Sequence, residues 1–175
     1  RFEMNKNLIK KCMKLKLIPT DVDGVLTDGG KYYGNKGESI KKFNTRDGMG
    51  VNILLRNNIK TGIITKDKSQ IVSKWASDMN ISLLFMGQKH KEQTLLKICK
   101  KYNYENFEIA YIGDDVNDVE LMKLVGFSAA PNDAITEVKK NADYVCIKNG
   151  GDGAFREITD LVLKIKFGKN VKWYD

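Results

Sequence analysis

The stretch Leu15-Lys-Leu-Ile-Pro-Thr-Asp-Val-Asp-Gly-Val-Leu-Thr-Asp28 joins a short apolar run to a loop that carries three carboxylates. The apolar part predicts a β-strand, although Pro19 lacks the N–H group that a central strand donates to its neighbour. Asp21 and Asp23 follow that strand directly. In open α/β sheets the functional site lies beyond the carboxyl ends of the strands. The stretch therefore predicts both the first strand and the first part of a site.

The rest of the chain alternates short apolar runs with amphipathic segments. A hairpin is predicted over residues 31–43. Further strands are predicted at residues 59–65, 81–85, 109–112, 127–130 and 144–147. Helices are predicted at residues 47–57, 68–79, 91–102, 116–125, from about 133, and 153–165. This alternation predicts an α/β fold, a doubly wound parallel sheet with helices on both faces.

Length and charge predict one domain between two basic tails. The 175 residues carry a formal charge of +8. Residues 1–16, with six basic and one acidic side chain, and residues 164–175, with four and one, account for all of this excess. We therefore expect a solvated N-terminal tail (1–14), a single domain (15–167) and a C-terminal tail (168–175). A body without net charge argues against nucleic-acid binding, and the absence of a long apolar run argues against a membrane span.

Cysteine and histidine are too sparse for several kinds of site. The three cysteines are far apart and form no CxxC pair, so neither a disulfide framework nor a zinc site is expected. The single histidine, His90, leaves little for chemistry that is built on histidine. A reducing, cytoplasmic location is the simplest expectation.

Polar residues follow several of the predicted strands. Thr65 ends one strand, Lys91 begins a helix, and Gly113-Asp-Asp-Val-Asn-Asp118 follows another strand. Carboxylates that meet at one sheet edge repel one another unless a cation neutralises them, and Mg²⁺ prefers oxygen ligands. An aspartate can attack phosphorus, and a second carboxylate can then act as acid and base. The pattern predicts phosphoryl transfer.

These motifs, in this order, resemble motifs I to IV of the haloacid dehalogenase superfamily. Two further segments, Phe43-Asn-Thr-Arg-Asp-Gly48 and Gly150-Gly-Asp-Gly-Ala-Phe-Arg-Glu157, resemble one branch of it. That branch contains phosphatases of 3-deoxy-D-manno-octulosonate 8-phosphate and of nine-carbon ulosonate 9-phosphates, including sialic-acid-type sugars. The resemblance covers about residues 15–165.

The resemblance implies a role for each acidic residue. Asp21 would be the nucleophile and Asp23 the acid and base. Mg²⁺ would be held by the carboxylates of Asp21 and Asp114 and by the backbone carbonyl of Asp23, with Asp115 contacting the metal only through water. The alternative for Asp114, Asp115 and Asp118 is helix capping.

The resemblance also implies how substrate is held. Gly24, Thr65 and Lys91 would bind the phosphoryl group, and Asp118 would orient Lys91, although Lys89 competes with Lys91 for this role. The branch is capless and forms homotetramers, in which a hairpin (here about 31–43) and the C-terminal region border a neighbour's pocket. The substrate would be a small anionic phosphosugar of sialic acid or lipopolysaccharide biosynthesis.

One departure from the branch bears on the sugar. Members that act on the eight-carbon substrate usually carry Gly-Arg after the motif II hydroxyl, whereas this chain has Lys66-Asp67. The change alters which sugar fits, and the hairpin and the run Lys41-Lys-Phe-Asn-Thr45 resemble the nine-carbon members, so a nine-carbon substrate is favoured. We expect Arg46, Asp67 and Arg156 to select the sugar. The alternative for Arg156 is an ion pair with Glu157 or Asp160 on its own helix.

Two other functions compete with a phosphatase. A signalling receiver domain also combines aspartates, a threonine and a lysine, but it needs its phosphate-accepting aspartate after a middle strand, where this chain has Thr65. A catalytically weak oligomerisation domain of the same fold, associated with a CMP-sugar synthetase, is the alternative that stays open.

Overall fold

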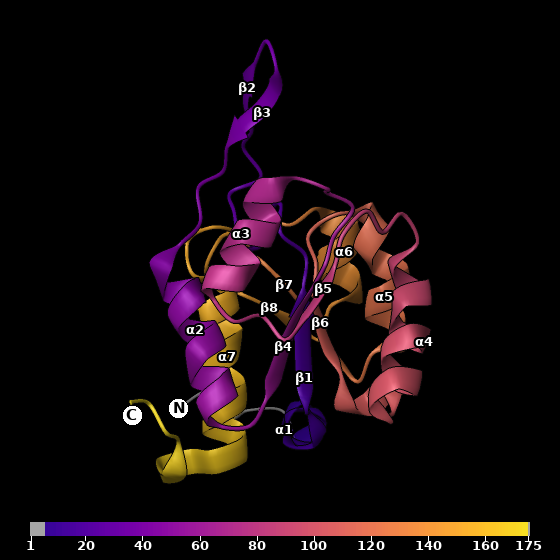
Figure 1. Cartoon of the computed structure of the whole chain (residues 1–175). Coiled ribbons are helices and arrows are strands. Elements are labelled where there is room, and N and C mark those ends of the chain that lie inside the picture. The colour runs from indigo at the N-terminus through magenta and orange to yellow at the C-terminus, as the bar shows by residue number, and fades with distance from the viewer. Residues whose placement is uncertain (1–5, 175) are drawn as a thin grey trace.

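A six-stranded parallel sheet forms the centre of the computed structural model, which describes residues 6–174 (Figure 1). The strand order is β5-β4-β1-β6-β7-β8. The strands are β1 (Leu17–Thr20), β4 (Lys60–Ile64), β5 (Leu83–Phe85), β6 (Ala110–Ile112), β7 (Phe127–Ala130) and β8 (Tyr144–Val145). The predicted α/β fold with a parallel sheet is confirmed.

Helices cover both faces of this sheet. One face carries α1 (Lys6–Lys14), α2 (Thr45–Arg56), α3 (Gln70–Asp78) and α7 (Ala154–Phe167). The other carries α4 (Lys91–Tyr102), α5 (Val119–Leu124) and α6 (Thr136–Asn141), and short 3₁₀ turns are η1 (Asn106–Glu108), η2 (Val116–Asp118) and η3 (Gly168–Asn170). Successive strand residues point to opposite faces, so Ile18 and Ile63 join the first core whereas Leu17 and Ile64 join the second.

Pro19 leaves a gap on one side of the central strand. β1 pairs with β4 over four consecutive residues, from Leu17 with Lys60 to Thr20 with Ile63. Toward β6 it makes only the Thr20–Ile112 pair and an isolated bridge from Leu17 to Ile109. Proline donates no backbone hydrogen bond. Its position in a central strand therefore interrupts the pairing of β1 with β6.

The expectation of solvated tails is wrong where the structure describes them. Helix α1 occupies the second part of the predicted N-terminal tail and buries Cys12, while residues 1–5 lie outside the described residues. In the C-terminal tail, Val171 is buried, and the backbone of Lys172 exchanges two hydrogen bonds with the Asn57 side chain. Apolar side chains within these lysine-rich segments give them a face to pack on the first core.

The predicted hairpin is present as β2 (Tyr32–Gly34) and β3 (Gly37–Ile40), an antiparallel pair. It projects from the body of the molecule at the end of the sheet where the strands finish (Figure 1). Within residues 6–174, no helix is both long enough and apolar enough to cross a bilayer.

Candidate active site

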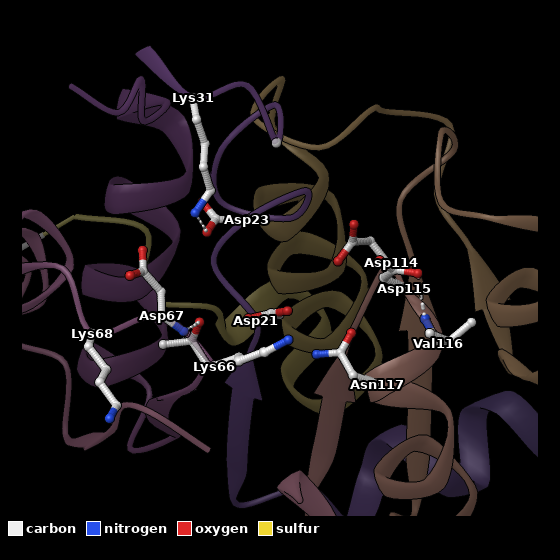
Figure 2. Close-up of a pocket in the computed structure, with 12 residues that line it drawn as sticks. Asp21, Asp23, Lys31, Lys66, Asp67, Lys68, Asp114, Asp115, Val116 and Asn117 are labelled. Carbon is white, nitrogen blue, oxygen red and sulfur yellow. Dashed lines mark hydrogen bonds and ion pairs between the residues drawn. The ribbon is translucent and has the colours of Figure 1, made fainter. Parts of the chain in front are cut away.

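A cavity of about 640 Å³ opens at the carboxyl edge of the sheet (Figure 2). Asp21 enters it directly after β1, where its backbone N–H donates to the Ile112 carbonyl at 2.9 Å and so extends the pairing of β1 with β6. The wall combines acidic and basic side chains. Its members are Asp21, Asp23, Gly29, Lys31, Thr65, Lys66, Asp67, Lys68, Asp114, Asp115, Val116 and Asn117.

Lys91 lies behind Asp21 and is fully buried. Its Nζ is 2.6 Å from Asp21 Oδ2 and 2.6 Å from Asp118 Oδ1. Burial lowers the pKa of the ammonium, but the two carboxylates outweigh burial, so the pKa of Lys91 is raised and the side chain stays charged. The structure thus places Lys91 beside Asp21 and Asp118, as expected, whereas its competitor Lys89 is exposed.

Both carboxylate oxygens of Asp118 accept hydrogen bonds from neighbouring residues in the protein. Oδ1 accepts from Lys91 and, at 2.8 Å, from the buried hydroxyl of Tyr111. Oδ2 accepts from the backbone N–H groups of Asp114 at 3.0 Å and Asp115 at 3.3 Å. These bonds fix both Lys91 and the loop that carries Asp114, so Asp118 supports the site without facing the cavity.

Asp114 is held in an unfavourable environment for a charged group. Its Oδ1 is buried and has no hydrogen-bond partner among the described residues. Burial, followed by repulsion from Asp21 and Asp118, raises the pKa of Asp114 to about 8. Burial and the nearby Asp118 likewise raise the pKa of Asp21 to about 6. The positive charge of Lys91 lowers both pKa values but does not outweigh these two causes.

Gly24 allows the first loop to approach Asp114. Its φ angle is +86°, and a Cβ atom at this position would lie 1.9 Å from Asp114 Oδ2. Any side chain at position 24 would therefore push Asp114 away from the loop of Asp21 and Asp23.

The acidic residues fit a hard divalent cation. One carboxylate oxygen each from Asp21, Asp114 and Asp118 lies within 4.8 Å of the others. Asp118 does not line the cavity, whereas Asp21 and Asp114, with its unpartnered Oδ1, do, so these two are the carboxylates that could hold a metal. All of these donors are oxygens, as Mg²⁺ prefers.

The Asp23 side chain points toward lysines. Its Oδ1 is 2.5 Å from Lys41 Nζ and 3.3 Å from the Thr27 hydroxyl, and its Oδ2 is 3.5 Å from Lys31 Nζ. Figure 2 shows the contact with Lys31 at the cavity wall. The Asp23 carboxylate is not part of the acidic cluster of Asp21, Asp114 and Asp118. Its carboxyl is partly exposed to the cavity, as an acid and base needs to be.

Thr65 and Asp115 both line the cavity. Thr65 is held by a backbone bond to Phe85 at 2.9 Å, and its Oγ1 accepts from Asp67 N at 3.1 Å. Asp115 caps η2 through a 2.7 Å bond from Val116 N to its Oδ1, so the capping interpretation holds for its carboxylate.

Two of the three predicted sugar-selecting residues lie elsewhere. Asp67 lines the cavity, but Arg46 and Arg156 line a separate hollow beside the start of α7. Arg156 Nε is 2.7 Å from Asp160 on the next turn of its own helix, and its backbone N–H donates to Asp47. Within one described chain, neither arginine reaches the cavity of Asp21.

Sequence reasoning missed three residues. Lys31 and Lys41 come from the hairpin and the segment after it, and no spacing rule relates them to Asp23. Tyr111 was assigned to a strand and to a segment of the resemblance, but not to the site. A buried tyrosine hydroxyl needs a partner, and this requirement was the available signal.

Comparisons with known proteins agree with this geometry. A family model described as haloacid dehalogenase-like hydrolase matches residues 36–158. The chain is 39% identical over 160 residues to 3-deoxy-D-manno-octulosonate 8-phosphate phosphatase of Escherichia coli strain K12, covering 91% of this chain and 85% of that protein.

Solved structures of phosphatases are also similar to this chain. The phosphatase of that name from Moraxella catarrhalis, in complex with magnesium, phosphate and the sugar acid, superimposes with a TM-score of 0.89 at 35% identity, covering 94% of each chain. The cobalt-bound enzyme from Haemophilus influenzae gives a TM-score of 0.88 at 38% identity, over 91% of this chain and 93% of that one.

Proposed function

Because the chain belongs to the haloacid dehalogenase-like hydrolases and is a phosphatase, we propose that it hydrolyses a phosphorylated 3-deoxy-ulosonate, with 3-deoxy-D-manno-octulosonate 8-phosphate as the preferred substrate. One observation carries the proposal: Asp21, backed by Lys91, and Asp114 meet at a cavity rimmed by lysines. Relatives that cover most of the chain carry this substrate in their names. The retained acidic set supports an enzyme over a catalytically weak oligomerisation domain.

The reaction proceeds in two steps that use two aspartates. In the first, a carboxylate oxygen of Asp21 bonds to phosphorus while the bond from phosphorus to the sugar oxygen breaks. Asp23 gives its proton to that oxygen, so the sugar leaves as an alcohol. In the second step, water bonds to phosphorus and gives a proton to Asp23. The aspartyl-phosphate bond breaks, and Asp21 is regenerated.

Neighbouring groups hold the phosphoryl oxygens and the nucleophile. Thr65 on the cavity wall and the backbone at Gly24, in the loop that carries Asp21 and Asp23, would donate to the phosphoryl oxygens. Lys91 neutralises Asp21, and Asp118 keeps Lys91 in place. Mg²⁺, held by Asp21, Asp114 and the backbone carbonyl of Asp23, would neutralise the carboxylates and polarise the phosphoryl group.

The metal-free protein is expected to become less stable as pH rises, and metal binding is expected to restore that stability. Asp114 has a folded pKa near 8, above its ordinary value of 3.8. Between these values the folded state keeps a proton that the unfolded state has released, so this group makes the metal-free protein less stable as pH rises. Mg²⁺ needs the ionised carboxylate, so its stabilising effect should increase from pH 6 to pH 8.

Thermal unfolding with and without MgCl₂ at pH 6, 7 and 8 measures this effect. In Asp114→Asn, the melting temperature should depend less steeply on pH, and added Mg²⁺ should no longer raise it. Equal stabilisation of Asp114→Asn and the natural chain by Mg²⁺ would argue against Asp114 as a ligand.

A separate part of the proposal concerns whether the sugar has eight or nine carbons. Lys31, Lys66 and Lys68 on the cavity wall suit an anionic sugar acid. The names of the relatives support eight carbons, whereas Asp67, at the position where the resemblance expects arginine, is the feature that favours nine.

Phosphate release from octulosonate 8-phosphate and two nonulosonate 9-phosphates, each with and without Mg²⁺, separates the two substrate classes. The highest kcat/KM should be for the eight-carbon ester and should require Mg²⁺. Preference for a nine-carbon ester would move the assignment to that sugar. No turnover of any of the three would overturn the ulosonate assignment.

We also propose that the chain works as a homotetramer. The hairpin projects from the body and exposes Tyr33 and Ile40, which are 77% and 58% exposed. Exposed apolar clusters of this kind mark surfaces that a partner covers, and a second copy would bring its hairpin near a neighbour's cavity. Light scattering during gel filtration gives the mass directly, and a monomer at micromolar concentration would contradict the proposal.

A further inference from the structure

We propose that Lys41 is a positioning residue for catalysis: its ammonium fixes the carboxyl group of Asp23, and Asp67 fixes Lys41. The inference rests on the proposed role of Asp23 as acid and base. Lys41 Nζ lies 2.5 Å from Asp23 Oδ1 and 2.9 Å from Asp67 Oδ2, and the Lys41 side chain is completely buried. A buried ammonium between two carboxylates forms a fixed bridge from the hairpin base to both loops.

Asp67 is a rigid anchor for this bridge. Its Oδ1 accepts from the Ser69 backbone N–H at 2.8 Å, and its own N–H donates to Thr65 Oγ1 at 3.1 Å. Burial raises the pKa of Asp67, but the ion pair with Lys41 and the hydrogen bond from Ser69 outweigh it, so the net pKa is lowered and the carboxylate stays charged. Asp67 therefore holds Lys41 and belongs to the same loop as Thr65.

The other contacts that the Asp23 carboxyl makes with described residues are longer. The Thr27 hydroxyl is 3.3 Å from Oδ1, and Lys31 Nζ is 3.5 Å from Oδ2 on a side chain that is 43% exposed. Without Lys41, the Asp23 side chain would be free to rotate between these contacts. Lys41 does not line the cavity, so it acts on the reaction through Asp23 and not by touching substrate.

This role predicts an effect that depends on the leaving group. An alcohol leaves poorly as an alkoxide, so a sugar phosphate needs the proton of Asp23 when its P–O bond breaks. A p-nitrophenolate is a good leaving group and departs without that proton. A misplaced Asp23 should therefore lower kcat/KM, which reports the first step, much more for the sugar phosphate than for p-nitrophenyl phosphate, since general acid catalysis contributes about 10²–10⁴-fold. The second step, in which Asp23 takes a proton from water, is common to both substrates.

The experiment compares Lys41→Met and Asp67→Asn with Lys42→Met. Lys42 is next in the chain, is exposed, and pairs with Asp28 instead. We expect Lys41→Met to lower kcat/KM for the sugar phosphate by about 10²-fold and kcat/KM for p-nitrophenyl phosphate by less than about 3-fold. Asp67→Asn should shift the ratio of the two in the same direction but less. Lys42→Met should leave it unchanged.

A second comparison tests that Lys41 works through Asp23. The double variant Asp23→Asn/Lys41→Met should be no slower on the sugar phosphate than Asp23→Asn alone, because two changes that disable one group do not add. Independent, additive losses would overturn the proposal.

Equal losses on both substrates in Lys41→Met and Asp67→Asn would also overturn it and would indicate a purely structural bridge. The ratio is measured with whichever alkyl phosphate the natural chain hydrolyses fastest. A wrong sugar in the proposed function would therefore change that substrate and would leave the test of Lys41 intact.

Discussion

Asp21→Asn is expected to abolish phosphate release, lowering kcat on the order of 10⁴-fold or more, as loss of a catalytic nucleophile does elsewhere. An amide nitrogen or oxygen does not form the bond to phosphorus that the carboxylate forms. The substitution also removes the negative charge that faces Lys91 at 2.6 Å and one of the two carboxylates that fit a metal. Phosphate release under saturating substrate and Mg²⁺ measures the loss.

The fold should survive this change. Burial opposes the ionised form of Asp21, whose pKa is raised to about 6, so a neutral side chain of the same shape is tolerated. Asp78→Asn, at the exposed end of α3, is the matched control and should retain full activity. If Asp21→Asn kept more than a tenth of the natural rate, Asp21 would not be the nucleophile.

Lys91→Met is expected to lose both activity and stability. The variant leaves Asp21 and Asp118 facing each other in a buried site without the ammonium that lies 2.6 Å from each. Removing one partner of a buried ion pair typically costs about 3–5 kcal/mol of unfolding free energy. Activity should fall by about 10³-fold because an oriented positive charge beside a reacting phosphoryl group is lost.

The pH dependence of the destabilisation in Lys91→Met distinguishes unpaired buried carboxylates from a simple loss of packing as its cause. In Lys91→Met the cost comes from unpaired carboxylates, so it should shrink as pH falls from 7.5 to 5 and these carboxylates take up protons. Urea unfolding at both pH values measures the cost, and Lys89→Met, an exposed neighbour, is the control. A destabilisation that is equal at both pH values would contradict this account.

The sequence predicts the parallel sheet and its acidic edge because both follow from local rules. Alternating apolar runs and amphipathic segments predict the order of elements, and parallel strands bring their carboxyl ends together. Asp21, Thr65 and Asp114 were found this way, although they lie far apart in the chain. In the structure Asp21 contacts Lys91, and the Asp114 backbone donates to Asp118.

Contacts that cross between non-neighbouring elements could not be predicted. Lys41 comes from the segment after the hairpin, and only the folded chain shows that it lies between Asp23 and Asp67. The same contact changes the interpretation of Asp67: an acid at that position lowers the charge available to a substrate, and here it also holds a buried lysine.

Helix α1 and the two arginines show the limits of reading charge alone. Lysines dominate residues 6–14, so the segment was expected to be solvated, yet Cys12 and its apolar neighbours pack on the first core. Arg46 and Arg156 were expected to select the sugar, but Arg156 pairs with Asp160 on its own helix, which was the alternative for this residue. The burial of α1 and the ion pair of Arg156 are both seen only in the folded chain.

The most direct test of the central claim is to trap the phosphorylated enzyme. Rapid acid quenching during turnover, followed by borohydride, reduces an aspartyl phosphate to homoserine, which mass spectrometry of the peptides can locate. We expect homoserine at position 21, formed only in the presence of substrate and absent from Asp21→Asn. Turnover without any reduced aspartate, or with the label on another aspartate, would contradict the assignment of Asp21 as the nucleophile.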